Sequence, residues 1–493
     1  MHGLIPSGAQ GARLAQRWLV AGTGALLAAL AMTALLPGTN LSYLLVVIPA
    51  LVLATIVARV EEPAARIVSM SLFVWALLLR LVATAGSHLL DATVWLGPDS
   101  RTYWTMSSDL ATSNLHLEVL PVVHFGSYDV GHYYLFAAAI RYLGADLFGL
   151  QVMNGALGAL ASPLAFGFTR IILPRAALWV GVLLAVHPSL IVLSAVDLLK
   201  DPSVVFATCL MVWAVIRLTR EEQASMLALY AIAGTGAALY LRTARFYAFA
   251  YLELSLIAAL VTLALIGVRV FARRAALALV FVTFLTAEVL PLRGAWPPSP
   301  VMLTDQIAFA LGSPGLRYYA AGFFDRVQPR AEQGESGSAP PSAAAPGVFR
   351  YPADFVRRLY GPFVWIPPED WRFSTLRRGE YLLYPGMLVW YALIPLVLAG
   401  MLLVARGIVR RTEREVGMVW LWCFTIIYFA QYFSINLSYR QRDVMLPMLL
   451  LFAHLGVTWM AGRRHWRLWY AGYWMTLAVV AAGHLAARAL LIR

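Results

Sequence analysis

The chain has 493 residues, of which 61% are hydrophobic and only 13% are charged, and its net charge is +13. The apolar residues come in blocks of about 20, the length that crosses ~30 Å of hydrocarbon as a helix. This composition excludes an ordinary soluble domain. It predicts an all-α fold, a polytopic membrane helix bundle.

Thirteen apolar blocks are expected to cross the membrane. The first is too long for a secretory signal and lacks a small-residue cleavage site, so we expect a retained helix. The only two cysteines, Cys209 and Cys423, fall inside apolar blocks, which argues against a disulfide framework and a thiolate metal cluster. The expected spans are 18–36, 41–58, 67–89, 147–169, 176–196, 203–218, 226–241, 246–267, 275–292, 384–405, 416–435, 444–461 and 468–490.

These spans divide the chain into four regions. Two long loops separate the spans, and we expect short interfacial helices in them, one of them over "VGHYYLFAAAIRYLG". The second loop contains a Pro/Ala/Ser/Gly-rich insert at 328–347 with almost nothing to bury. The regions are an N-terminal hairpin (1–66), a core (67–292) with the first loop (90–146), the second loop (293–383) and C-terminal helices (384–493).

The basic residues predict the orientation of the bundle. With a cytoplasmic N-terminus, the inner segments hold eighteen arginines and the short outer turns hold five lysines and arginines. The positive-inside rule favours this orientation, which places both long loops on the outer, periplasmic face. It also explains the positive charge without nucleic acid, because the inner arginines would mostly anchor the chain at anionic lipid.

Polar clusters that break this charge rule all fall on the predicted outer face. An ionisable residue at the edge of a span is a functional-site hypothesis, because leaving it unpaired near hydrocarbon costs roughly 2.5 kcal/mol or more. The clusters are "PDSRTYW" (98–104), "SYDVGHYY" (127–134), "DLLKDP" (197–202), "LRTARF" (241–246) and "YRQRD" (439–443).

Each cluster also has a purely structural interpretation. Asp99 and Ser100 have the residue types of a helix N-cap. Lys200 and Asp201 have the arrangement of a self-neutralising pair at a helix entrance, and His132 suits interfacial packing. Asp129 suits a helix cap. The arginines whose side chains suit snorkelling to lipid headgroups are Arg242, Arg245, Arg440 and Arg442.

Taken together, an outer carboxylate and several outer cations suit a phosphate-linked substrate with a lipid tail. Arginine and lysine bind phosphate oxygens and stabilise the charge that develops on a departing phosphate. A carboxylate near a positive site stays ionised and can take a proton from an attacking hydroxyl. This chemistry is glycosyl transfer from a polyprenyl-phosphate sugar to a periplasmic glycan, lipid or protein.

The motifs also resemble a known superfamily. "GPDSRTYW" matches the "G-x-D-x-x-x-Y" pattern of the C-type (GT-C) membrane glycosyltransferases, which include protein O-mannosyltransferases and aminoarabinose transferases. "GHYYLFAAAIRYLG" and the helix ending in "DLLKDP" are similar to the segments that follow in that superfamily. "LYLRTARFY" and "NLSYRQRDVMLP" look like its bacterial surface-polysaccharide branch. The resemblance covers roughly 67–292 and 384–461.

The resemblance implies an inverting glycosyltransferase of the bacterial inner membrane, with Asp99 as the general base. It leaves open whether Asp129 assists, because some relatives have paired acids. The aromatic residues would face sugar rings, Asp201 would orient Lys200, and Arg101 would reach either substrate. The predicted phosphate-binding residues are Lys200, Arg242, Arg245, Arg440 and Arg442, and the predicted sugar-facing residues are Tyr103, Trp104 and Tyr134, with His132 beside them.

Several alternatives stay open. A polysaccharide polymerase or ligase that uses a lipid-diphosphate-linked glycan would need similar outer arginines, and a lipid or oligosaccharide transporter is the non-enzyme alternative. No dense His/Asp/Glu set has metal spacing, so no metal site and no other cofactor are expected, although a divalent cation remains an alternative. Arg80 and Glu253, the charges nearest mid-span, are expected to pair. The loop 293–383, with "YGPFVWIPPEDWRF", is a candidate acceptor platform.

Overall fold

The computed structural model describes residues 9–91, 96–113, 130–267, 382–435 and 442–491. Within these ranges the chain is helical and contains no β-strand. The predicted span 275–292, the insert 328–347, the acceptor platform, Asp129 and Arg440 lie outside them.

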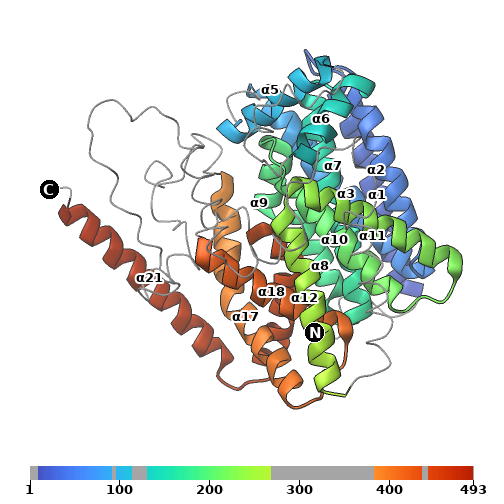
Figure 1. Cartoon of the computed structure of the whole chain (residues 1–493). Coiled ribbons are helices and arrows are strands. Elements are labelled where there is room, and N and C mark those ends of the chain that lie inside the picture. Colours follow the sequence, from blue (N-terminus) through green and yellow to red (C-terminus); the bar gives the residue numbers. More distant parts are fainter. Residues whose placement is uncertain (1–8, 92–95, 114–129, 268–381, 436–441, 492–493) are drawn as a thin grey trace, which may run out of the picture.

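Figure 1 shows the helices of the first half packed as one bundle. They are α1 (Ala9–Thr33), α2 (Ser42–Arg59), α3 (Pro63–Leu89), α5 (Pro98–Thr112), α6 (Val130–Leu143), α7 (Leu147–Ile172), the 3₁₀ turn η3 (Pro174–Ala176), α8 (Ala177–Val186), α9 (Pro188–Ile191), the π-helical turn η4 (Val192–Val196), α10 (Asp201–Leu218), α11 (Ala224–Ala244) and α12 (Phe246–Leu265).

The C-terminal helices pack against this bundle through α17, α18 and α20, whereas α21 diverges from it (Figure 1). Two tyrosines tie α21 to α17: the Tyr470 hydroxyl donates to Ala392 O, and that of Tyr473 to Tyr391 O. The elements are α17 (Tyr384–Val409), α18 (Val416–Ile435), the 3₁₀ turn η8 (Asp443–Met445), α20 (Leu446–Ala461) and α21 (Trp466–Leu491).

Eight of the described helices are long and apolar enough to cross a membrane. They match eight of the thirteen expected spans, so a multi-pass membrane protein is supported and the count of thirteen is not established. The expected span 176–196 is broken, because α8 and the α9–η4 segment meet at 49°. Helices α12, α18 and α21 cover three further expected spans without meeting the same length and hydropathy test in their described parts.

The break in the fifth span occurs at His187 and Pro188. Proline has no N–H and cannot continue the hydrogen-bond ladder, so carbonyls of the preceding turn need other partners. Arg80 on α3 is such a partner, because its Nη1 donates to Ala185 O at 3.0 Å. The same atom also donates to Ala76 O of its own helix. We expected Arg80 to pair with Glu253; that prediction was wrong, because the guanidinium contacts these carbonyls instead.

Helix α7 is the central element of the bundle. Its small residues let neighbouring helices approach closely: a Cβ at Gly158 would lie 3.1 Å from Arg80 Nε and 3.3 Å from Pro202. Small residues at helix interfaces are typical of membrane bundles, where close packing rather than hydrophobic burial holds helices together. The sequence "MNGALGALASPLAFG" thus positions both Arg80 and the start of α10.

Candidate functional site

Most of the described residues predicted for the site gather where α10 begins, and we call this part of the bundle the Asp201 end. Helices α5 and α6 lie across it at the top of Figure 1. The opposite end, where α10 and α7 finish, is called the Glu61 end.

Two polar side chains of α7 position the chain that leads into α10. Gln151 Nε2 donates to Val196 O at 2.9 Å, and Asn154 Nδ2 donates to Leu199 O at 2.8 Å. Residues three apart on a helix share a face, so both amides reach the same segment. They fix the irregular stretch 197–200 between η4 and α10. Sequence analysis missed both residues, although polar side chains at this spacing in a small-residue helix are a usable signal.

Asp197 connects this stretch to α5. Its buried carboxylate accepts from the backbone N–H of Gly97 at 3.2 Å and from the Ser100 hydroxyl. A carboxylate at a helix N-terminus satisfies free N–H groups and opposes the positive end of the helix dipole. Asp197 stood within the "DLLKDP" cluster but was not among the predicted site residues.

Asp99 is exposed in the first turn of α5, beside the anchored Ser100. The N-cap position belongs to Gly97, which makes no side-chain capping bond, so the interpretation of Asp99 as the cap is wrong. Arg101, also on this turn, is exposed as well. Both side chains are therefore accessible from outside the protein at the Asp201 end.

Asp201 forms a buried ion pair with Arg245, the residue between α11 and α12. Arg245 Nη2 lies 2.7 Å from Asp201 Oδ1, and the two side chains are only 5% and 2% exposed. We expected Asp201 to orient Lys200 and Arg245 to bind phosphate; both roles stay predictions, and the structure adds an ion pair between Asp201 and Arg245. Lys200, which precedes α10, is also buried. Arg242, one turn earlier on α11, is partly exposed.

His132 sits in a hydrogen-bond network rather than on the surface. Its Nδ1 lies 3.1 Å from the Tyr240 hydroxyl, which is 2.6 Å from the Ser203 hydroxyl, and Ser203 donates to Lys200 O. Burial, together with the charges of Lys200 and Arg245, lowers the pKa of His132 well below its ordinary value. The neutral ring is fully buried, which favours a positioning role over direct contact with substrate.

Helix α6 reaches this network because of the glycine that precedes His132. A Cβ at Gly131 would overlap the side chain of Thr243 on α11. Glycine therefore lets α6 approach α11 closely enough for His132 to contact Tyr240.

The predicted sugar-facing aromatics divide into buried and accessible ones. Tyr103 is buried and packs edge-on against His132, with ring centroids 4.9 Å apart, and against Tyr133 at 5.2 Å. Trp104 and Tyr134 are partly exposed. Only the latter two offer surface to a ligand, and Tyr103 supports the His132 network.

Arg442 brings a further cation to the Asp201 end, at the start of η8. Its guanidinium lies over the Trp390 ring, 4.5 Å from the centroid, and Nη2 contacts Met387 Sδ at 3.4 Å. Nη1 is buried and has no hydrogen-bond partner among the residues that the structure describes. The next residue, Asp443, is close enough to Asp201 and Arg245 to feel their charges. The buried cations here therefore precede α10 and η8 or lie at the α11–α12 junction.

The Glu61 end holds several of the arginines predicted as lipid anchors. Glu61 is buried and pairs with Arg170 on α7, at 2.6 Å, and with Arg217 on α10. Glu62 also pairs with Arg170, and Arg220 pairs with Glu415 before α18. These three arginines therefore join loops and helix ends to one another, and the expectation that the inner arginines as a group anchor the chain at lipid stays a prediction.

No protein-family model matches the chain, and no curated protein matches it. Within the described ranges, no three His, Cys, Asp or Glu residues are grouped as metal ligands.

Proposed function

We propose that the chain is a membrane glycosyltransferase of the GT-C type. It would transfer a sugar from a polyprenyl-phosphate donor to a glycan, lipid or protein acceptor. The observation that carries this proposal is the Asp201 end itself, where the cations Lys200, Arg245 and Arg442 are buried together with the acids Asp197, Asp201 and Asp443. Buried cations that suit an anionic group, next to helices that suit a lipid tail, support a lipid-phosphate substrate.

The proposed reaction inverts the anomeric carbon. The Asp99 carboxylate takes the proton of the acceptor hydroxyl while that oxygen forms the new bond to the anomeric carbon. The bond from this carbon to the phosphate oxygen breaks, and the lipid phosphate leaves with its electron pair. Lys200, Arg242, Arg442 and Arg440 would stabilise the added negative charge, with Arg245 held by Asp201. No resident metal or other cofactor is part of the proposal.

We assign the Asp201 end to the periplasmic side of a bacterial inner membrane. The support is the distribution of arginines over the alternate connections in the sequence. Trp104 and Tyr134 are the aromatic faces proposed for the sugar rings, because both are partly exposed.

The decisive experiment compares wild type with Asp99→Asn. Purified proteins receive a radiolabelled polyprenyl-phosphate sugar pool, with bacterial lipid and polysaccharide as acceptors. We expect turnover by wild type and a loss of about 10²–10⁴-fold in the variant, because removing a general base typically costs this much. Asp109→Asn is the matched control, since Asp109 is an exposed acid on the same helix; it should retain wild-type turnover.

Two outcomes would count against this assignment. Equal turnover by Asp99→Asn and Asp109→Asn would remove the catalytic role of Asp99. Consumption of a lipid-diphosphate-linked glycan, with no use of the monophosphate donor, would place the protein among polymerases or ligases.

A transporter is the second candidate because of the broken span at His187. Broken helices and buried charges near mid-span are features of transporter sites, and Arg80 lies directly at this break. Donor-independent movement of a fluorescent polyprenyl lipid across proteoliposomes, with no glycosyl transfer, would favour this alternative.

A further inference from the structure

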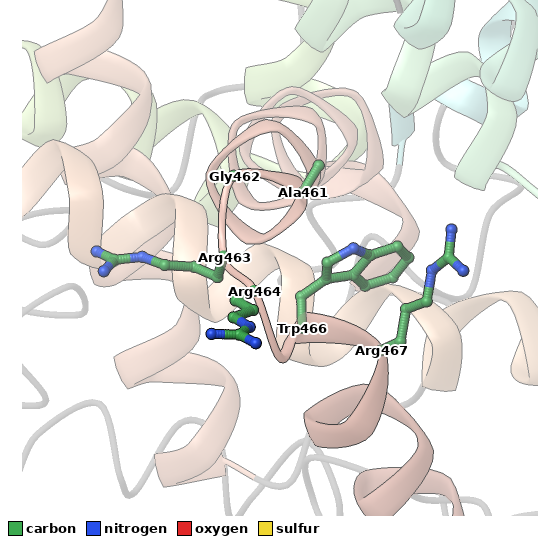
Figure 2. A pocket seen from close by; sticks show the side chains of 6 residues that line it. All are labelled: Ala461, Gly462, Arg463, Arg464, Trp466 and Arg467. Atoms are coloured by element: carbon green, nitrogen blue, oxygen red, sulfur yellow. The ribbon is translucent and has the colours of Figure 1, made fainter.

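A second basic site lies at the Glu61 end, where α20 turns into α21. This turn holds an open pocket of about 500 Å³, and Figure 2 shows the residues that line it. Its lining consists of Ala461, Gly462, Arg463, Arg464, Trp466 and Arg467. No part of the Asp201 end contributes to it.

The three arginines of this pocket differ from the other arginines of the Glu61 end. Arg170, Arg217 and Arg220 all pair with acids, whereas no acid lines the pocket and its arginines make no ion pair within the described ranges. Two of them contact tryptophans instead: Arg463 lies 4.8 Å from the Trp459 ring centroid, and Arg467 lies 5.7 Å from that of Trp466. Stacking holds a guanidinium in place and leaves its N–H groups available to an anion.

An apolar surface continues from the pocket along α21. Leu468 and Trp469 are 70% and 75% exposed, and Met475 and Val479 further along the helix are 69% and 66% exposed. Helix α21 also diverges from the other described helices in Figure 1. A ligand that suits both features has an anionic head and long apolar chains.

We propose that this pocket binds the headgroup phosphate of an anionic phospholipid, whose acyl chains lie along α21. Arginine forms bidentate, charge-assisted hydrogen bonds with phosphate, and tryptophans favour the membrane interface. Basic pockets at helix ends bind anionic lipid headgroups by this chemistry. The proposal does not depend on the glycosyltransferase assignment.

The test is lipid retention by the purified full chain, measured by native mass spectrometry. The protein, held in phosphatidylcholine-containing micelles, is titrated with phosphatidylglycerol. We expect one tightly held phosphatidylglycerol in wild type. Arg463→Gln/Arg464→Gln/Arg467→Gln should bind at least about tenfold more weakly, and the corresponding triple lysine variant should fall in between, because it keeps the charge and loses the bidentate geometry.

The matched control is Arg406→Gln/Arg410→Gln/Arg411→Gln. It removes three exposed arginines at the end of α17 and in the turn that follows, and none of the three lines this pocket. We expect wild-type retention in this control. An equal loss in both triple variants, or none in the pocket variant, would overturn the proposal. Displacement of the bound lipid by equimolar inorganic phosphate would overturn it too, since the site would then recognise free phosphate.

Thermal melting in phosphatidylcholine verifies that the variants fold. If the pocket triple variant does not fold, Arg464→Gln alone serves, because Arg464 makes no cation–π contact with a described tryptophan. We expect a two- to threefold weaker binding in this single variant, and wild-type binding would overturn the proposal.

Discussion

Arg245 and Asp201 are a buried ion pair whose two partners depend on each other. Arg245→Gln should destabilise the protein by roughly 3–5 kcal/mol, because it leaves the Asp201 carboxylate buried without its counter-charge. Denaturation of the purified protein in detergent, followed by circular dichroism, measures this loss.

The matched control for this pair is Arg242→Gln. Arg242 is one turn away on α11 and only partly buried, so its removal should cost less than about 1 kcal/mol. Similar losses in Arg242→Gln and Arg245→Gln would contradict a specific role for the ion pair.

His132 should make stability depend on pH. Its pKa is lowered in the folded protein, so the unfolded chain binds a proton that the folded chain does not. The contribution of neutral His132 to the free energy of unfolding is therefore fully present above the ordinary pKa of about 6.5. It falls as the pH drops below that value, by up to about 1.4 kcal/mol per pH unit. Lys200 and Arg245 face the ring as cations, and Tyr103 and Tyr240 contact it.

The measurement is thermal melting between pH 7.5 and 5, with His132→Gln beside wild type. Glutamine does not titrate, so the variant should lose less stability than wild type over this range. Parallel curves for the two proteins would contradict the prediction, because they would show that folding does not change the pKa of His132.

The sequence predicted which residue types gather at the Asp201 end better than it predicted their contacts. The polar clusters could be assigned to one face of the membrane from two features of the sequence alone. These are the number of spans between the clusters and the distribution of arginines over the connecting loops. The pairing of Asp201 with Arg245 depends on how α10 meets the α11–α12 junction. No local pattern contains that information, and the same holds for the link from Asp197 to α5.

At the scale of helices, the backbones of α17 and α20 approach each other closely. Glycines occur on both sides: a Cβ at Gly400 would overlap Phe452 O, and one at Gly456 would overlap Leu396 O. Gly400→Ala and Gly456→Ala should each separate the helices and lower the melting temperature by several degrees, because backbone carbonyls cannot move aside as a side chain can.

Gly236→Ala on α11 is the control for this contact, since nothing lies near its added Cβ. Alanine favours helix by roughly 0.5–1 kcal/mol over glycine, so this variant should be neutral or more stable. Destabilisation of all three variants to the same extent would point to glycine flexibility rather than close packing.

Helix boundaries were predictable where apolar blocks and charge boundaries coincide. Eight expected spans match long apolar helices within the described ranges. The fifth span was predicted as one continuous helix. Hydropathy is averaged over a window of residues and does not register that Pro188 has no backbone N–H. The bend of 49° at this residue was therefore not expected.

At the scale of the molecule, Glu61 joins α7 and α10 at the end opposite the proposed active site. Glu61→Gln should lower stability by less than the 3–5 kcal/mol of a fully buried pair, because Arg170 and Arg217 are partly exposed and Arg170 keeps Glu62. Glu62→Gln, at an exposed carboxylate, should cost less than about 1 kcal/mol. Urea or heat denaturation in detergent ranks the two, and a larger loss for Glu62→Gln would contradict the central role of Glu61.

The contact between Arg80 and Ala185 also affects the order in which the chain is assembled. Arg80 lies 105 residues before Ala185, so during synthesis its charge enters the bilayer before the broken span exists. An arginine at the middle of a helix opposes insertion by about 2.5–3.5 kcal/mol. The other apolar residues of α3 must outweigh that charge while the chain is still growing. During synthesis the bundle is therefore incomplete, and Arg80 has no carbonyl acceptor from another helix until the fifth span is inserted. Ala185 O of that span then accepts from Arg80.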